Sequence, residues 1–113
     1  MKRDMELIRK ILITLEESEK TQGWTPLKFK GYSDDQISYQ VKILAKQGII
    51  EATDCSSMNN FAWEAKGLTW DGHDYIEAIR DDARWEKVKD WIKNAGKILT
   101  METLKQAVTE LFF

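Results

Sequence analysis

The stretch Ser33–Ile50, SDDQISYQVKILAKQGII, decides the fold because it contains the start, the buried face and the end of one helix. Ser33 followed three residues later by Gln36 is a capping-box pattern, in which each side chain satisfies a backbone N–H group of the other residue. The pair Asp34–Asp35 falls in the first turn, where negative charge meets the positive end of the helix dipole. The sequence therefore predicts a helix over residues 33–47.

The same stretch shows which side of this helix is buried and how it ends. Ile37, Val41 and Leu44 recur at helical spacing, which places them on one apolar stripe. Gly48 supplies the left-handed conformation that commonly ends a helix, and the β-branched pair Ile49–Ile50 suits a strand. We therefore expect the helix to lead directly into a strand.

Composition and charge limit the classes of protein to consider. With 113 residues, 42% of them hydrophobic and 32% charged, the chain is expected to form one globular domain. Seventeen Lys and Arg against nineteen Asp and Glu give a net charge of −2, which argues against strong non-specific binding of nucleic acid. A lone Cys55 has no thiol partner for a disulfide or a Cys-rich metal site. No apolar run approaches a membrane span and no signal-peptide core is present, so we expect a cytoplasmic protein.

Two elements are expected before residue 33. An amphipathic helix is predicted over about residues 3–19, because apolar residues recur on one side of it. Between residues 20 and 32, Gly23 and Gly31 make a continuous helix improbable, and Pro26 disfavours helical backbone at the residue before it. We expect residues 27–30 to form no more than a short strand at the edge of a sheet. The predicted apolar residues of the first helix are Met5, Ile8, Ile11, Leu12 and Leu15.

The residues after Gly48 predict a β-hairpin followed by another helix. Segments 49–53 and 61–68 read as strands, and the run DCSSMNN between them consists mainly of turn-forming residues. Thr69 is placed to cap the next helix, and Gly72 allows the first turn of that helix to approach its neighbour closely. We therefore expect two antiparallel strands that lead into a helix start at residues 68–72.

The remainder of the chain is predicted to be helical. A second apolar stripe continues past residues 81–82, either on the same helix, bent there, or on a separate helix. Asn94 and Gly96 end that stripe, and Thr100 opens a last helix. We expect a single domain over residues 1–113, with 84–113 as a helical extension. The three predicted stripes are Tyr75, Ile76, Ile79 and Ala83; Trp85, Val88, Ile92 and Ala95; and Met101, Leu104, Val108, Leu111 and Phe112.

Part of this pattern resembles the winged-helix module of bacterial regulators, over roughly a third of the chain. In that module S-x-H-L-x-x-L-x-x-x-G-L-I leads through the wing into L-T-x-x-G. Gln40 stands where those families often have His. The resemblance implies an α+β, winged-helix-like fold with a helix, a short edge strand, a second helix, a β-hairpin wing and C-terminal helices. The matching residues are Ser38, Val41, Leu44, Gly48, Ile49 and Ile50, then Leu68, Thr69 and Gly72.

Three longer stretches resemble a family of uncharacterised bacterial and prophage proteins, domain-of-unknown-function family 2513. They are MKRDMELIRKIL, GYSDDQISYQVKILAKQGIIEA and LTWDGHDYIEAIRDDARW, and together they span Met1 to about Trp85. The resemblance implies a winged-helix-like fold and brings no assigned activity with it.

The winged-helix resemblance implies that the helix after Ser33 enters the major groove of DNA while the hairpin touches a neighbouring groove or phosphate. With the apolar stripe inward, helical geometry turns the lysines and the tyrosine of this helix outward. The lysines would meet phosphates, the tyrosine would stack or hydrogen-bond, and the other two residues would flank them. The candidate nucleic-acid-binding residues are Gln36, Ser38, Tyr39, Lys42 and Lys46.

Several observations speak against DNA binding. Asp35 shares the outward face and would repel a phosphate, and residues 54–60 at the hairpin tip contain no Lys or Arg. Residues 31–68 carry three basic and five acidic side chains, so the supposed reading surface is net negative. The segment Gly23 to Gly31 also leaves little room for the helix that usually precedes a recognition helix. The alternative is that the polar residues of this face are simply solvated.

Catalysis finds no support in the sequence. His73 is the one histidine, and its neighbours Asp71 and Asp74 would point to different sides of a helix. Cys55 lies on a polar turn without a cationic partner nearby. Neither a phosphate-binding glycine loop nor a nucleophile elbow is present. We therefore expect a non-enzymatic protein without a metal site, a cofactor or a small-molecule ligand.

A protein-interaction module is the remaining class. Five Trp residues offer more aromatic surface than one small core readily hides, and the chain ends in the apolar run LFF. These residues either fill the core or mark contact with a partner or a second copy through the C-terminal helices. The sequence thus predicts a DNA-associated regulator of bacterial or prophage origin or, as the alternative, a protein–protein adaptor on the same scaffold.

Overall fold

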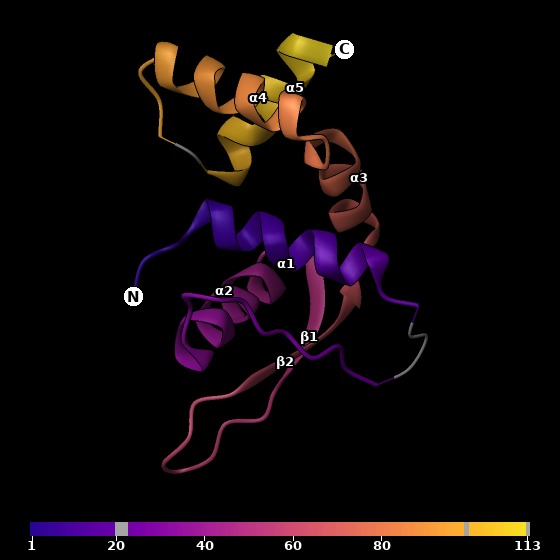
Figure 1. Ribbon diagram of the computed structural model, residues 1–113, viewed down its shortest axis with the longest axis vertical. Helices are drawn as coiled ribbons and strands as arrows, with labels where there is room; N and C mark the ends of the chain where they lie inside the picture. The colour runs from indigo at the N-terminus through magenta and orange to yellow at the C-terminus, as the bar shows by residue number, and fades with distance from the viewer. Residues whose placement is uncertain (20–22, 99, 113) are drawn as a thin grey trace. The chain divides into compact units, whose positions relative to one another are not determined.

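The computed structural model describes residues 1–19, 23–98 and 100–112, and within these residues the chain forms five helices and one two-stranded antiparallel sheet (Figure 1). The predicted α+β class is therefore confirmed. Contacts divide the chain into two compact units, Met1–His73 and Asp74–Phe113. In the described residues, no helix is both long enough and apolar enough to cross a bilayer.

The first helix, α1, spans Met5–Glu17 and lies within the predicted range. Asp4 caps it, because one carboxylate oxygen accepts a hydrogen bond from the Leu7 N–H group at 3.0 Å. The predicted stripe is buried, and Leu7 widens it. Helix α1 contacts α2 and strand β2 of the hairpin, so this stripe forms much of the core of the first unit. The buried residues are Met5, Leu7, Ile8, Ile11, Leu12 and Leu15.

Helix α2 spans Asp34–Lys46 and begins as the capping box predicts. The Gln36 N–H group donates to the Ser33 hydroxyl at 3.1 Å, and the Ser33 N–H group donates to the Gln36 side-chain oxygen at 2.8 Å. The predicted stripe is buried, and Gly48 has a φ of +73° at the end of the helix. The prediction for this helix is therefore confirmed at both ends and along its buried face.

Strands β1, Ile50–Asp54, and β2, Trp63–Leu68, form the predicted antiparallel hairpin. Their register changes once: Glu51 lies opposite Gly67, whereas Ala52 lies opposite Ala65. The residue between these two on β2, Lys66, is therefore an extra residue, which makes a β-bulge. Helix α2 contacts both strands.

The predicted edge strand at residues 27–30 is wrong: the structure describes these residues and assigns no strand to them. Instead, one backbone hydrogen bond of 2.8 Å joins the Thr25 N–H group to the Ala65 carbonyl oxygen of β2. Pro26 follows without an N–H group to donate, which explains why the ladder does not continue. The extended chain before residue 27 therefore bonds to β2 through the Thr25 backbone.

Thr69 fastens the start of helix α3, Trp70–Ile79, to the end of α2. Its hydroxyl oxygen accepts from the Gly72 N–H group at 3.1 Å, and it lies 2.6 Å from the Gly48 carbonyl oxygen and 2.9 Å from that of Ile49. The Thr69 N–H group also donates to the Ile49 oxygen, at 3.1 Å. A Cβ atom on Gly72 would lie only 2.1 Å from that same oxygen. The predicted cap and the predicted close approach are both confirmed.

In the second unit, the open question of one bent helix or two is settled in favour of two. Helix α3 ends at Ile79, and Asp81 caps helix α4, Asp82–Asn94, by accepting from the Ala83 and Arg84 N–H groups at 2.8 and 3.1 Å. Ala83 therefore lies in the first turn of α4 and is exposed, so its predicted place on a buried stripe is wrong. Ala95, the residue that follows α4, is exposed too.

Helix α5 spans Met101–Phe112 and packs against α4. The predicted stripes of both helices are buried at their centres, and Ala107 adds to that of α5. Leu111, near the end of α5, is 37% exposed. The side chain of Met101 and residue Phe113 lie outside the described parts. The buried residues of α4 and α5 are Trp85, Val88, Ile92, Leu104, Ala107 and Val108.

Candidate functional site

The five candidate residues all lie on α2, but they differ in how far their side chains are free to meet a ligand. Gln36 is engaged in the cap, and Ser38 is buried and accepts a hydrogen bond from the Trp63 N–H group at 3.3 Å. These two side chains therefore hold α2 to its own start and to the hairpin. Tyr39 is half-buried, and Lys46 is exposed in the last turn.

Lys42 belongs to α2, and its side chain lies near the hairpin. Its ammonium group is 5.9 Å from the centre of the Phe61 ring, within the range of a cation–π contact. Hydrogen bonds from Ser56 hold the pKa of Asp54 below its usual value, and the Lys42 charge lowers it further. Asp54 thus compensates part of the Lys42 charge, whereas Lys46 is open to solvent.

Gln40 joins the N-terminal segment to α2. It is 2% exposed, its amide NH₂ group donates to the Lys2 carbonyl oxygen at 2.9 Å, and its amide oxygen accepts from the Asp4 N–H group at 3.0 Å. Lys2 and Arg3, here called the basic arm, are exposed beside the helix. These two hydrogen bonds, here called the tether, join residues that are 36 and 38 positions apart in the chain. Sequence patterns along α2 therefore do not reveal the tether. The available signal is that Gln40 occupies the buried stripe, where a polar side chain needs partners.

The charges around α2 differ from those expected for residues 31–68 alone. Lys28 forms an ion pair with Asp34 at the helix start. Helix α2 together with Lys28 and residues 2–4 carries five basic side chains and three acidic ones, a net charge of +2. The hairpin carries Lys66 against Glu51, Asp54 and Glu64, a net charge of −2. The negative charge of this region therefore belongs to the hairpin, and the helix with its bonded segments is positive.

Cys55 begins the hairpin turn and is exposed. Partial desolvation raises the pKa of its thiol, and a hydrogen bond and the charge of Glu64 raise it further. Asp54 acts in the same direction, while Lys66 opposes it. The thiol is therefore held in its protonated form at neutral pH, which is the opposite of what a nucleophile or a metal ligand requires.

Replacement of Glu64 by Gln is expected to increase the alkylation rate of Cys55 several-fold at pH 7.5. The change removes the charge that raises the thiol pKa, so the reactive thiolate fraction grows. The measurement is the second-order rate constant with iodoacetamide. Glu51→Gln, a carboxylate on the partner strand, is the matched control and should leave the rate unchanged. Equal rates for the folded wild type and the urea-unfolded chain would contradict the shifted pKa.

His73 lies exposed in the first turn of α3, where its backbone N–H group donates to the Thr69 oxygen at 3.0 Å. In the parts of the chain that the structure describes, no group of three or more His, Cys, Asp and Glu side chains is placed to share a metal ion. The described residues therefore bring together no set of ligands for metal chemistry.

The Trp residues divide between the two alternatives that the sequence left open. Trp85 is buried in the second unit, and Trp63 and Trp91 are half-buried. Trp24 is 45% exposed, and Trp70, at the start of α3, is 82% exposed. Trp85 fills a core, whereas Trp70 offers its ring to solvent.

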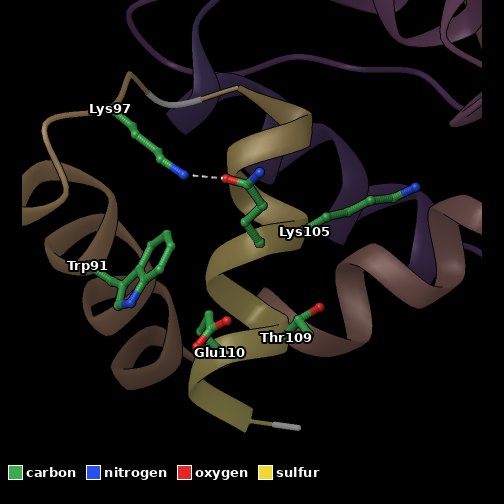
Figure 2. Close-up of a pocket in the computed structure, with 6 residues that line it drawn as sticks. Trp91, Lys97, Lys105, Thr109 and Glu110 are labelled. Carbon is green, nitrogen blue, oxygen red and sulfur yellow. Dashed lines mark hydrogen bonds between the residues drawn. The ribbon is translucent and has the colours of Figure 1, made fainter.

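A surface pocket of about 500 Å³ lies over α5 beside α4, and Figure 2 shows the residues that line it. The Lys97 ammonium group donates to the Gln106 side-chain oxygen at 2.7 Å and lies 5.6 Å from the Trp91 ring. Lys105 extends away from Trp91, with its ammonium group 5.3 Å from the Tyr75 ring (Figure 2). Lys97, Gln106 and Lys105 are thus engaged in contacts within the protein. The lining residues are Trp91, Lys97, Lys105, Gln106, Thr109 and Glu110.

Comparison with known proteins gives a family and a relative. A family model described as "Hypothetical protein (DUF2513)" matches residues 2–98. An "Uncharacterized protein" of Haemophilus influenzae is 39% identical over 107 residues, which cover 94% of this chain and 91% of that protein. No solved structure matches the chain.

Proposed function

This chain belongs to the DUF2513 family of hypothetical proteins, and from that premise we propose that it is a non-enzymatic regulator that binds duplex DNA through α2. The bacterial or prophage origin expected from the sequence suits such a role. In this proposal α2 faces the major groove, and the basic arm and Lys46 contact the phosphates on either side. The observation that carries the proposal is the tether through Gln40, which brings the basic arm to α2.

The support from the fold is the order and the rigidity of the elements. A helix, an extended segment bonded to β2, a second helix and a hairpin follow one another as in a winged-helix module. Helix α2 is capped at its start, ends at Lys46 just before Gly48, and is backed by buried residues along its length. A helix held in this way can present an outward face in a fixed position, as docking in a groove requires.

The support from electrostatics is the separation of charge between the helix and the hairpin. Phosphate contacts supply most of the affinity of non-specific DNA binding, and they come mainly from Lys and Arg. In homeodomains, an N-terminal basic arm beside the recognition helix reaches into the adjacent minor groove. The arrangement of Lys2, Arg3 and Lys46 supplies three cations of this kind, and the ion pair of Lys28 neutralises one of the two acids in the first turn of α2.

Lys46→Ala and Arg3→Ala are each expected to reduce the salt dependence of DNA binding by about one unit of slope, since each removes about one phosphate contact. Lys42→Ala should reduce it less, because Asp54 already compensates part of that charge. The measurement is fluorescence anisotropy with a labelled duplex between about 50 and 200 mM salt. Lys93→Ala, an exposed lysine on α4, is the matched control. A wild-type Kd weaker than about 10⁻⁴ M at physiological salt would exclude the proposal.

The second candidate is a protein–protein adaptor, and the 82% exposure of Trp70 favours it. Large aromatic side chains that remain in solvent are common anchors of protein interfaces, and a second copy or another protein would cover them. In this case Trp70→Ala should abolish association with the second copy or the other protein. The wild type should then bind DNA more weakly than ordinary non-specific binding. Light scattering of the purified chain at micromolar concentration shows whether it associates with a second copy, and Trp70→Ala shows whether that association depends on Trp70.

A further inference from the structure

The tip of the hairpin is a short turn held by hydrogen bonds. The Ser57 N–H group donates to the Asn60 oxygen at 2.8 Å, and the Asn60 N–H group donates to the Ser57 oxygen at 3.2 Å. Met58 and Asn59 are therefore the two central residues of the turn. Figure 1 shows this tip extending away from α1 and α2.

Further bonds stiffen the base of the turn. The Ser56 N–H group donates to the Asp54 carboxylate at 2.9 Å, and the Ala62 N–H group donates to the Ser56 hydroxyl at 3.0 Å. The same hydroxyl lies 3.2 Å from the Ala62 carbonyl oxygen. A tip with this many fixed backbone groups holds its apex in one orientation.

Met58, at the apex, is 98% exposed. A single exposed apolar residue is ordinary, but this one stands at the apex of a turn whose backbone is held by hydrogen bonds. Residues 55–62 also contain no charged side chain of either sign. Such a tip forms no ion pair with a phosphate, yet it loses no ion hydration when it enters a narrow groove.

The neighbours of Met58 suit the floor of the minor groove. Asn59 and Asn60 are exposed, and their amide groups both donate and accept hydrogen bonds. The minor groove presents acceptors at every base pair, and proteins that bind there use Asn to read them and Met to wedge between base steps. The combination of one rigid apolar apex and two amides therefore matches minor-groove insertion better than phosphate contact.

We propose that Met58 is a wedge that enters the minor groove of duplex DNA and partly unstacks one base step, so that the duplex bends. Asn59 and Asn60 bond to the base edges beside that step. This inference rests on the proposed DNA binding and adds to it a preference for easily unstacked steps such as TA. It also gives the uncharged tip of the hairpin, residues 55–62, a role that differs from that of the basic residues at α2.

The test uses two duplexes of equal length with a fluorescent donor and acceptor at their ends, one with central TA steps and one without them. The wild type should raise energy transfer on the TA duplex, and Met58→Leu should do the same. Met58→Ala should lose this signal and bind the TA duplex about tenfold more weakly, the equivalent of about 1.4 kcal/mol. Its affinity for the other duplex and its salt slope should stay unchanged, because no phosphate contact is lost.

Each outcome decides between the parts of this proposal. If Met58→Ala bends and binds the TA duplex as the wild type does, the wedge is wrong and DNA binding through α2 stands. If the wild type binds neither duplex more tightly than about 10⁻⁴ M, both ideas fall, and a protein pocket becomes the expected partner of Met58. The melting temperature of Met58→Ala should equal that of the wild type, since the side chain is exposed.

Discussion

Gly72→Ala is expected to lower the free energy of unfolding by about 3 kcal/mol, at the upper end of the usual cost of overpacking. The new Cβ atom would lie 2.1 Å from the Ile49 carbonyl oxygen, far inside contact distance. That oxygen is part of the backbone and accepts from the Thr69 N–H group, so it cannot move without loss of the bonds that start α3. Urea unfolding measures the change, and the melting temperature should fall by roughly 10 °C.

Gly67→Ala is the matched control for this clash. Gly67 lies in β2, a Cβ atom there would meet nothing within 4 Å, and its φ is not positive. The variant should stay within about 0.5 kcal/mol of the wild type, as most surface substitutions do. An equally small change for Gly72→Ala would mean that α3 does not approach the end of α2 as the structure has it.

Gln40→Ala is expected to cost about 2 kcal/mol of stability, because it leaves the Asp4 N–H group and the Lys2 carbonyl group without their partner. The change also frees the basic arm, so under the proposed DNA binding the salt slope should fall by about one unit, as is expected for Arg3→Ala. Urea unfolding gives the first quantity and anisotropy the second. Hydrogen exchange adds a local measurement, since the Asp4 amide should lose its protection before the rest of α1 does.

Gln47→Ala is the matched control, because it removes a glutamine from the end of α2 and leaves the hydrogen bonds of Gln40 in place. Gln47 is exposed at the end of the same helix, so its removal should change stability by less than about 0.5 kcal/mol and leave the salt slope intact. An unchanged Asp4 exchange rate in Gln40→Ala would show that residues 2–4 are held by other contacts.

The elements that the sequence predicts well are those whose signals are local. Ser33 and Gln36 specify the start of α2 within four residues, and Gly48 specifies its end. Thr69 and Gly72 likewise define the start of α3 and its close approach to α2. In each case the residue types that form the feature lie within a few positions of one another, so the sequence pattern contains the signal.

The features that the sequence does not reveal depend on residues far apart in the chain. Segment 27–30 has the composition of a weak strand, but whether it pairs depends on β2, whose backbone hydrogen bond goes to Thr25, before the segment begins. Ala83 has helical spacing from Ile79, but the cap at Asp81 starts a new helix and turns it outward. The spacing of apolar residues alone therefore predicts a continuous stripe across such a break, because the spacing contains no information about the cap.

The same limit applies to the candidate site. Outward geometry on α2 is right for Lys46, but the burial of Ser38 depends on an N–H group of β2, and the compensation of Lys42 depends on Asp54. The basic arm joins the site through Gln40, across 36 and more positions. A charge count over residues 31–68 alone therefore leaves out the basic arm and Lys28, which the structure brings to α2.

The β-bulge in the hairpin has a consequence for behaviour at high concentration. In the described sheet β1 pairs with β2 alone, so its other edge offers free N–H and C=O groups to any passing strand. The extra residue Lys66 increases the local twist, and Glu51 and Asp54 put exposed carboxylates along that edge. A second chain that docked there would have to untwist the ribbon and bring like charges together. The bulge and these carboxylates therefore disfavour pairing of the hairpin edge with a strand of another chain.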